Sequence, residues 1–168
     1  ARQGFKAGRA QARDLREQVT AELLPRAFVK RSLVYAWIDP VNRWLVVDAA
    51  SPAKADEVLE HLKLTLEDLP LKLLRTSTAP ATAMTAWVAG QNAPARFCID
   101  RDCELRAAGL EKAVVRYVRH ALDGKEIAEH IAAGKTVTRL GMTWHDRVSF
   151  VLTEQLQLKR LAFLDVLK

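Results

Sequence analysis

Short runs of β-branched and aromatic residues, each bounded by turn residues, most restrict the fold that this chain can adopt. Residues 28–39 and 44–49 are rich in Val, Tyr, Trp and Ile, and a turn sequence at residues 39–43 separates them. Two such runs joined by a short polar turn predict a β-hairpin. Residues 69–75 show a similar apolar pattern and are predicted to form a third strand.

Helices are predicted where capping residues precede an apolar pattern. Ser51 followed by Pro52 is a typical helix start. Asp123, with Glu126 three residues later, has the spacing of a capping box. The predicted helices are residues 7–24, 51–63, 78–89 and 123–133. The first of these is amphipathic, because Leu15 and its apolar neighbours at four-residue spacing oppose a basic face.

The C-terminal half is dominated by strand-like segments. The predicted strands there are residues 95–100, 104–107, 113–120, 135–144, 147–153 and 158–165. The fold class is therefore α+β, with mostly antiparallel sheets and a few packed helices, and two hairpin-plus-helix halves are one interpretation of the pattern. The domains we expect are a basic amphipathic helix (1–25), a ββαβ-plus-helix subdomain (26–90) and an antiparallel β-rich subdomain with one helix (91–168).

The charge of the chain suits either a polyanionic partner or plain solubility. The 168 residues include 26 Lys and Arg against 20 Asp and Glu, which gives a formal net charge of +6. Both ends are basic and the middle is slightly acidic. The ordinary composition excludes disorder as the main state. The longest nearly uncharged run, residues 76–95, is interrupted by Pro80, Gly90 and Pro94, so no membrane span or membrane partner is expected.

Motifs for catalysis or metal binding are missing from the sequence pattern. Cys98 and Cys103 have no second cysteine pair, and the histidines are scattered, so we expect no catalytic residue, no metal site and no cofactor. Two cysteines without a signal-peptide pattern favour a reducing, cytoplasmic setting. Asp39, Asp48 and Asp100 lie at predicted strand ends and leave a metal-dependent nuclease open, although a role in turns is favoured.

The four tryptophans have two interpretations. Trp37, Trp44, Trp87 and Trp144 could stack on nucleic-acid bases. Three of them lie in apolar predicted strands, where a role in the core is favoured.

Several blocks of sequence occur in an order that matches one known family. They are residues 23–28, 37–42, 47–51, 54–56, 85–88, 126–127, 130–131, 133–135, 137–138 and 158–161. In the block at residues 85–88, Ala86 stands where the family has Glu. These blocks are spread over nearly the whole chain, and through them the sequence resembles the RdgC family of recombination-associated proteins.

The resemblance has several implications. Members of the family are longer, so we expect a fragment, with one segment before Ala1 and another after Lys168. They are bacterial proteins that bind double-stranded DNA without marked sequence preference, form a ring-like homodimer around the duplex and limit the access of RecA recombinase to DNA. A cytoplasmic, nucleoid-associated location is therefore expected. Some members are described as exonucleases, but this sequence shows no convincing catalytic cluster, so we expect a protein that is not an enzyme.

The candidate DNA-binding residues are Arg26, Lys30, Arg31, Arg116, Arg119, Lys125, Lys135, Arg139, Lys159 and Arg160. Arg26, Lys135, Lys159 and Arg160 lie inside blocks that resemble the family, whereas the others are chosen for their charge. Phe28 is a candidate contact between subunits, with a core position as the alternative. A metal-dependent nuclease, or a protein-interaction region that acts through the acidic middle of the chain, remain the alternative functions.

Overall fold

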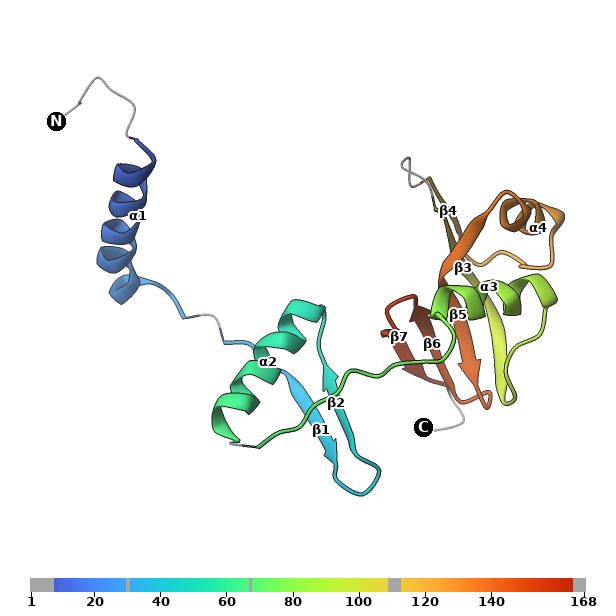
Figure 1. Cartoon of the computed structure of the whole chain (residues 1–168), viewed down its shortest axis with the longest axis horizontal. Coiled ribbons are helices and arrows are strands. Elements are labelled where there is room, and N and C mark those ends of the chain that lie inside the picture. The colour runs from blue at the N-terminus through green and yellow to red at the C-terminus, as the bar shows by residue number, and fades with distance from the viewer. Residues whose placement is uncertain (1–7, 30, 67, 109–112, 165–168) are drawn as a thin grey trace. The chain divides into compact units, whose positions relative to one another are not determined.

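The computed structural model describes residues 8–29, 31–66, 68–108 and 113–164. The chain divides into two compact units, residues 1–71 and residues 72–168, and each contains its own sheet. The described residues form helices together with two antiparallel sheets, one of two strands and one of five (Figure 1). The predicted α+β class with mostly antiparallel sheets is therefore confirmed.

The first unit begins with the predicted N-terminal helix. Helix α1 spans Arg9–Leu23, and a 3-10 turn, η1, follows at Leu24–Arg26. Pro25 ends the α-helix because proline cannot donate the backbone hydrogen bond that a further turn needs. None of the residues of α1, all of which are described, is buried.

The hairpin and helix that follow were largely predicted. Strands β1 (Tyr35–Asp39) and β2 (Trp44–Asp48) pair antiparallel, and helix α2 spans Pro52–Thr65. The hydroxyl of Ser51 accepts the backbone N–H of Lys54 at 3.4 Å, which confirms the predicted helix start. Strand β1 begins at Tyr35, later than the predicted start at residue 28.

The prediction of a third strand after α2 is wrong. Residues 69–75, all of them described, form no strand, and the two-stranded sheet consists of β1 and β2. Pro70 removes one N–H donor from the segment, and a strand needs a paired neighbour to satisfy its backbone groups. The arrangement after η1 is therefore ββα.

The second unit is built around the five-stranded sheet in the order β4-β3-β5-β6-β7. Its strands are β3 (Phe97–Ala107), β4 (Val114–Tyr117), β5 (Lys135–Trp144), β6 (Val148–Thr153) and β7 (Leu158–Phe163). Two strands predicted between residues 95 and 107 are the single strand β3, whose pairing with β5 is irregular between Ile99 and Cys103. The second unit therefore does not repeat the hairpin-plus-helix arrangement of the first unit.

Helices α3 (Pro80–Gly90) and α4 (Lys125–Ala132) pack against one face of this sheet. Met84 and Val88 of α3 and Ile127 of α4 join Leu105 and Leu140 of the strands in one buried cluster. The structure therefore places α3 in the second unit, whereas the sequence grouped it with residues 26–90. Its hydrogen bond to the sheet supports this placement: the Thr85 hydroxyl accepts the backbone N–H of Val137 at 2.9 Å.

The start of α4 differs from the prediction. Gly124 and not Asp123 occupies the N-cap position, and it makes no side-chain capping bond. The helix begins at Lys125, so Glu126 stands two residues after the N-cap and not three, and lacks the spacing that a capping box requires.

Among the residues that the structure describes, no helix combines the length and the apolar character needed to cross a bilayer.

Candidate nucleic-acid interface

The two faces of the five-stranded sheet differ in chemistry. Side chains alternate between faces along a strand, so the register of the sheet assigns each residue to one of them. Leu105, Val137 and Leu140 point to the face that α3 and α4 cover, here called the helix face. The opposite face, here called the polar face, carries the following charged residues of β3, β4, β5 and β7: Asp100, Asp102, Glu104, Arg106, Arg116, Arg139, Lys159 and Arg160.

A row of three charged residues crosses the polar face. Glu104 in β3 lies directly opposite Arg116 in β4 and directly opposite Arg139 in β5. Arg116 donates to Oε2 of Glu104 from Nη2 at 2.6 Å and from Nε at 3.2 Å. Nε of Arg139 lies 3.7 Å from Oε1 of the same carboxylate. Two of the predicted DNA-binding residues are therefore joined by a carboxylate that the prediction did not include.

Glu104 is a buried acidic residue, with 2% of its surface exposed. Arg106, two residues along β3, donates to its Oε1 from Nη2 at 3.3 Å, and the hydroxyl of Thr138 donates to Oε1 at 3.1 Å. Burial raises the pKa of the Glu104 carboxyl, but the hydrogen bonds from Arg116 and Thr138 and the charge of Arg139 outweigh it. The net effect is a lowered pKa, so Glu104 is ionised at neutral pH.

A β-bulge brings Thr138 to this carboxylate. The pairing of β3 with β5 shifts between Glu104 and Leu105, so that β5 contains one more residue than β3 at this point. As a result Thr138 and Arg139, which are adjacent in sequence, both contact Glu104.

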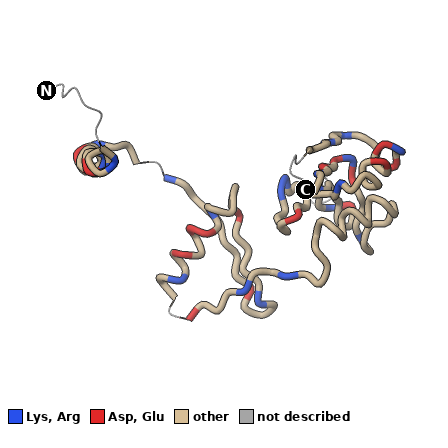
Figure 2. The backbone as a smooth tube through the Cα atoms, turned by 45° about the horizontal axis from the view of Figure 1, so that its top comes forward, with Lys and Arg blue, Asp and Glu red and all other residues tan. Residues whose placement is uncertain are grey.

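The other end of the polar face holds two more of the predicted cations. Arg160 forms an ion pair with Asp102 at 3.8 Å, and Lys159 lies opposite Val151 of β6. Asp100 accepts the hydroxyl of Thr143 at 2.9 Å. Burial and the nearby charge of Asp102 raise the pKa of Asp100, despite the opposing effect of the hydrogen bond from Thr143. Figure 2 marks the Lys and Arg positions along the strands of this unit.

The remaining predicted cations are not part of this row of charged residues. Nζ of Lys135 lies 3.0 Å from Nδ1 of His130 on α4, which places it on the helix side. Lys125 is exposed at the start of α4, and Arg119 follows β4, with its backbone N–H donating to Asp102. Arg26 and Arg31 are exposed in the first unit. Lys30 lies outside the described residues.

Phe28, the candidate subunit contact, is fully exposed in the first unit. The alternative of a core position is therefore not supported within this chain.

Asp39 and Asp48, the two candidate nuclease residues of the first unit, do not come together. Asp39 and Asp48 lie at opposite ends of the β1–β2 hairpin, because Asp39 pairs with Trp44 and Asp48 pairs with Tyr35. Asp39 acts in the turn, where it accepts the backbone N–H groups of Val41 and Asn42 at 3.0 Å each. Asp100 belongs to the other unit. Over the described ranges, no group of three His, Cys, Asp or Glu side chains is arranged to hold a metal ion.

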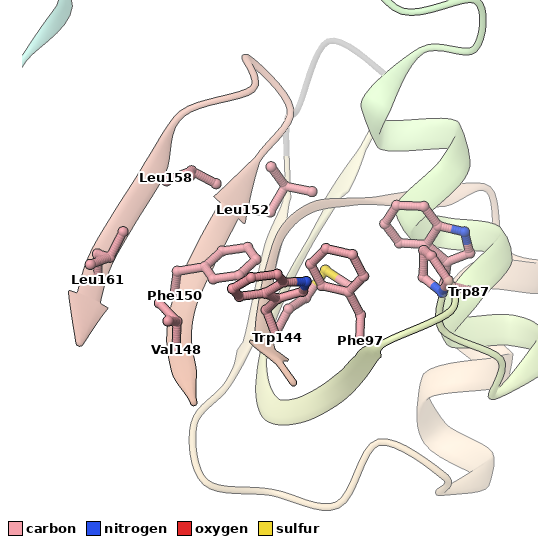
Figure 3. A pocket seen from close by; sticks show the side chains of 10 residues that line it. Trp87, Phe97, Trp144, Val148, Phe150, Leu152, Leu158 and Leu161 are labelled. Atoms are coloured by element: carbon pink, nitrogen blue, oxygen red, sulfur yellow. The ribbon is translucent and has the colours of Figure 1, made fainter. Parts of the chain in front are cut away.

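The tryptophans are more exposed than the sequence suggested. Trp37 and Trp44 are exposed on the two-stranded hairpin of the first unit. Trp87 and Trp144 line an apolar hollow of about 480 Å³ on the helix face, between α3 and strands β6 and β7 (Figure 3). Phe150 and Leu152 from β6 and Leu158 from β7 complete much of its wall.

Sequence reasoning missed Arg106 and Glu104. The alternation Asp102, Glu104, Arg106 was visible as a strand with every second residue charged, which is typical of a polar sheet face. The pairing that brings Arg116 and Arg139 beside Glu104 has no comparable local signal.

Comparison with known proteins identifies the family of this chain. The family model described as "Putative exonuclease, RdgC" matches residues 1–168. The chain is 58% identical over 171 residues to the recombination-associated protein RdgC of Dechloromonas aromatica, covering 100% of this chain and 56% of that protein. It is 54% identical over 166 residues to the protein of the same name from a Janthinobacterium species, covering 99% of this chain and 55% of the relative.

The chain therefore belongs to the RdgC family, as its sequence blocks indicated. It spans about half the length of the curated relatives that it matches.

Proposed function

We propose that this chain binds double-stranded DNA without sequence preference, through the polar face of its second unit. The observation that carries the proposal is the gathering of five cations on one face that neither α3 nor α4 covers. They are Arg106, Arg116, Arg139, Lys159 and Arg160. Lys and Arg side chains neutralise backbone phosphates, which are the same in every sequence. Such a face should therefore bind duplexes of different sequence with similar affinity.

The family suggests the setting of this binding. We propose that the whole protein forms a ring-like homodimer around the duplex and limits the access of RecA recombinase to DNA. A closed ring would prolong weak phosphate contacts, because release would require an interface to open. The relatives are named recombination-associated proteins, which supports a role in recombination. The cytoplasm and the nucleoid are the location that belongs to this proposal. No membrane partner is part of this proposal.

Fluorescence anisotropy with short duplexes of unrelated sequence tests the proposed binding. We expect similar affinities that fall steeply as salt rises, with the DNA left intact in the presence of magnesium. Affinities that differ strongly between sequences, or that do not respond to salt, would contradict the proposal. Salt-independent behaviour would instead favour a protein-interaction region.

Lys159 and Arg160 provide a sharper test. Replacement of both by Ala should weaken binding to all duplexes evenly and reduce the slope of log K against log salt by about one for each phosphate that is no longer neutralised. Replacement of the exposed turn residue Arg147 by Ala, compared with each of the two single variants, is the control matched in charge. An unchanged slope in the double variant would remove these residues from the interface.

Exonuclease activity is the second candidate function, because the description of the matching family includes it. Shortening of an end-labelled duplex in magnesium, abolished in the Asp100→Asn variant, would support it. Intact duplex would leave the binding function as the better account.

The proposed homodimer concerns Phe28. Because this side chain is fully exposed, its replacement by Ser should leave the fold of the chain unchanged. We expect analytical ultracentrifugation to show a weaker dimer for Phe28→Ser than for the unmodified protein. Undiminished dimerisation would assign the contact to other residues.

A further inference from the structure

Three guanidinium groups of the polar face converge on one carboxylate. Glu104 holds Arg116 on one side and Arg139 on the other, and Arg106 approaches from its own strand. The carboxylate is buried, whereas the side chains of Arg116, Arg139 and Arg106 are 60%, 47% and 39% exposed. The arginines are thus anchored at their inner side and open to solvent at their outer side.

The donors of this cluster exceed its acceptors. Each guanidinium has roughly five N–H donors, and a carboxylate accepts about four hydrogen bonds in all. Part of the capacity of Glu104 is taken by the hydroxyl of Thr138. Nε of Arg106 is buried and has no hydrogen-bond partner among the described residues. The cluster therefore presents N–H groups that a further acceptor could satisfy.

The charges of the cluster are also unbalanced. Glu104 supplies one negative charge, and Glu154 supplies a second at 3.8 Å from Nη1 of Arg106. The three arginines therefore exceed these two carboxylates by one positive charge. Guanidinium groups held close together repel one another, and an oxyanion between them would relieve that repulsion. Arginine suits phosphate in particular, because its planar fork matches two phosphate oxygens at once.

We propose that Glu104 is a positioning residue that holds Arg106, Arg116 and Arg139 together as one binding site for a phosphate oxyanion. On a duplex the ligand is a backbone phosphodiester. Only this last identification rests on the proposed DNA binding, since the site itself is defined by the arginines and the carboxylate. Glu104 contributes by positioning the arginines, although its negative charge by itself repels a phosphate.

Glu104→Gln separates geometry from charge. The substitution makes the chain more positive, so binding that depended on charge alone would tighten. We expect instead roughly tenfold weaker binding to short duplexes in fluorescence anisotropy, because the arginines lose their charged anchor. Glu129→Gln, at an exposed position of α4, makes the same change in charge and should bind as tightly as the unmodified chain or slightly more tightly. Unchanged or tighter binding by folded Glu104→Gln overturns the proposal.

Arginine-to-lysine variants decide the matter if Glu104→Gln fails to fold. Arg116→Lys and Arg139→Lys preserve the charge at half-exposed positions but remove the planar fork. Each should weaken duplex binding severalfold, whereas Arg147→Lys in the β5–β6 turn should have no effect. Equal affinities in all three variants would contradict a fixed arginine site.

A readout without DNA distinguishes this inference from the proposed function. In the full chain, titration with inorganic phosphate should shift the Nε–Hε NMR signals of Arg106, Arg116 and Arg139, and Glu104→Gln should reduce these shifts. Phosphate-induced shifts without any duplex binding would support the oxyanion site and refute the DNA proposal. Duplex binding without these shifts, and unaffected by Glu104→Gln, would refute the oxyanion site and leave the DNA proposal standing.

Discussion

Both units consist of helices and antiparallel strands, but among the described residues only the second unit has a buried apolar core. Every buried apolar side chain that the structure describes, from Met84 to Phe150, lies in the second unit. In the first unit, large apolar residues such as Trp37 and Val46 are exposed. A two-stranded hairpin with one helix has too few layers to enclose a core, whereas five strands covered by two helices can do so. The first unit therefore depends on local interactions, and the second on packing.

The largest difference between the units should appear on deletion of a leucine side chain. Leu105→Ala in the second unit should lower the free energy of unfolding by about 2–5 kcal/mol, because Leu105 is fully buried. Leu64→Ala in the first unit should change it by less than about 0.5 kcal/mol, because Leu64 is almost fully exposed. Urea unfolding followed by circular dichroism measures both. Equal effects would show that the two units do not differ in their dependence on packing.

Threonine hydroxyls provide a second comparison. Thr85→Val in α3 should cost about 1–3 kcal/mol, because the buried N–H of Val137 loses its acceptor. Thr65 in α2 only donates to the carbonyl of His61 on an exposed helix, so Thr65→Val should have little effect. Hydrogen exchange should also show faster exchange of the Val137 amide in Thr85→Val. Protection of that amide at the unmodified level would contradict the assigned contact.

Helix capping should matter more in the first unit. Ser51→Ala removes the acceptor at the start of α2 and should cost about 1 kcal/mol of helix stability, whereas Ser51→Asp keeps an acceptor and should restore it. In α4 the N-cap residue is Gly124, which provides no side-chain cap. Thermal melts of the three proteins check this prediction. A melt of Ser51→Ala identical to that of the unmodified chain would show that tertiary contacts and not the cap hold α2.

The smallest effect should be seen in the pH dependence. A carboxylate whose pKa is lowered by folding stabilises the fold above its unfolded pKa and loses that contribution as the pH falls through its folded pKa. Glu104 is such a group, so the difference in unfolding free energy between the unmodified chain and Glu104→Gln should shrink as the pH falls from 7 to about 3. Asp100 has a raised pKa, so its ionised form lowers the stability of the fold at neutral pH. Relative to the unmodified chain, Asp100→Asn should therefore be more stable at neutral pH than it is at acid pH.

Local signals in the sequence predicted the elements that depend on local interactions. Ser51 and Pro52 identified the start of α2, and the apolar pattern of residues 135–144 matched β5 in full. The predicted strand at residues 69–75 failed because strand formation needs a neighbour, and the sequence does not reveal whether one is present. The same limit applied to the two predicted strands that are one strand, β3.

Most cations of the candidate site were predicted, but the contacts that join them were not. Arg116, Arg139, Lys159 and Arg160 were selected for their charge or their block, and the structure places them on one face. Lys135 was selected on the same grounds and lies on the other. The strand register and the bulge in β5 decide which cations share a face. The positions of the charged residues in the sequence reveal neither of them.

The bulge at Thr138 also governs how the length of β5 can vary among related chains. Val137 faces the helices before the bulge, and Leu140 and Met142 face them after it, so the two ends of the strand are out of phase by one residue. Loss of one residue at position 138 would restore regular alternation and keep all three in the core. Loss of one residue beyond the bulge would turn an apolar side chain toward solvent. A single-residue gap in this strand should therefore be tolerated at the bulge and selected against on either side of it.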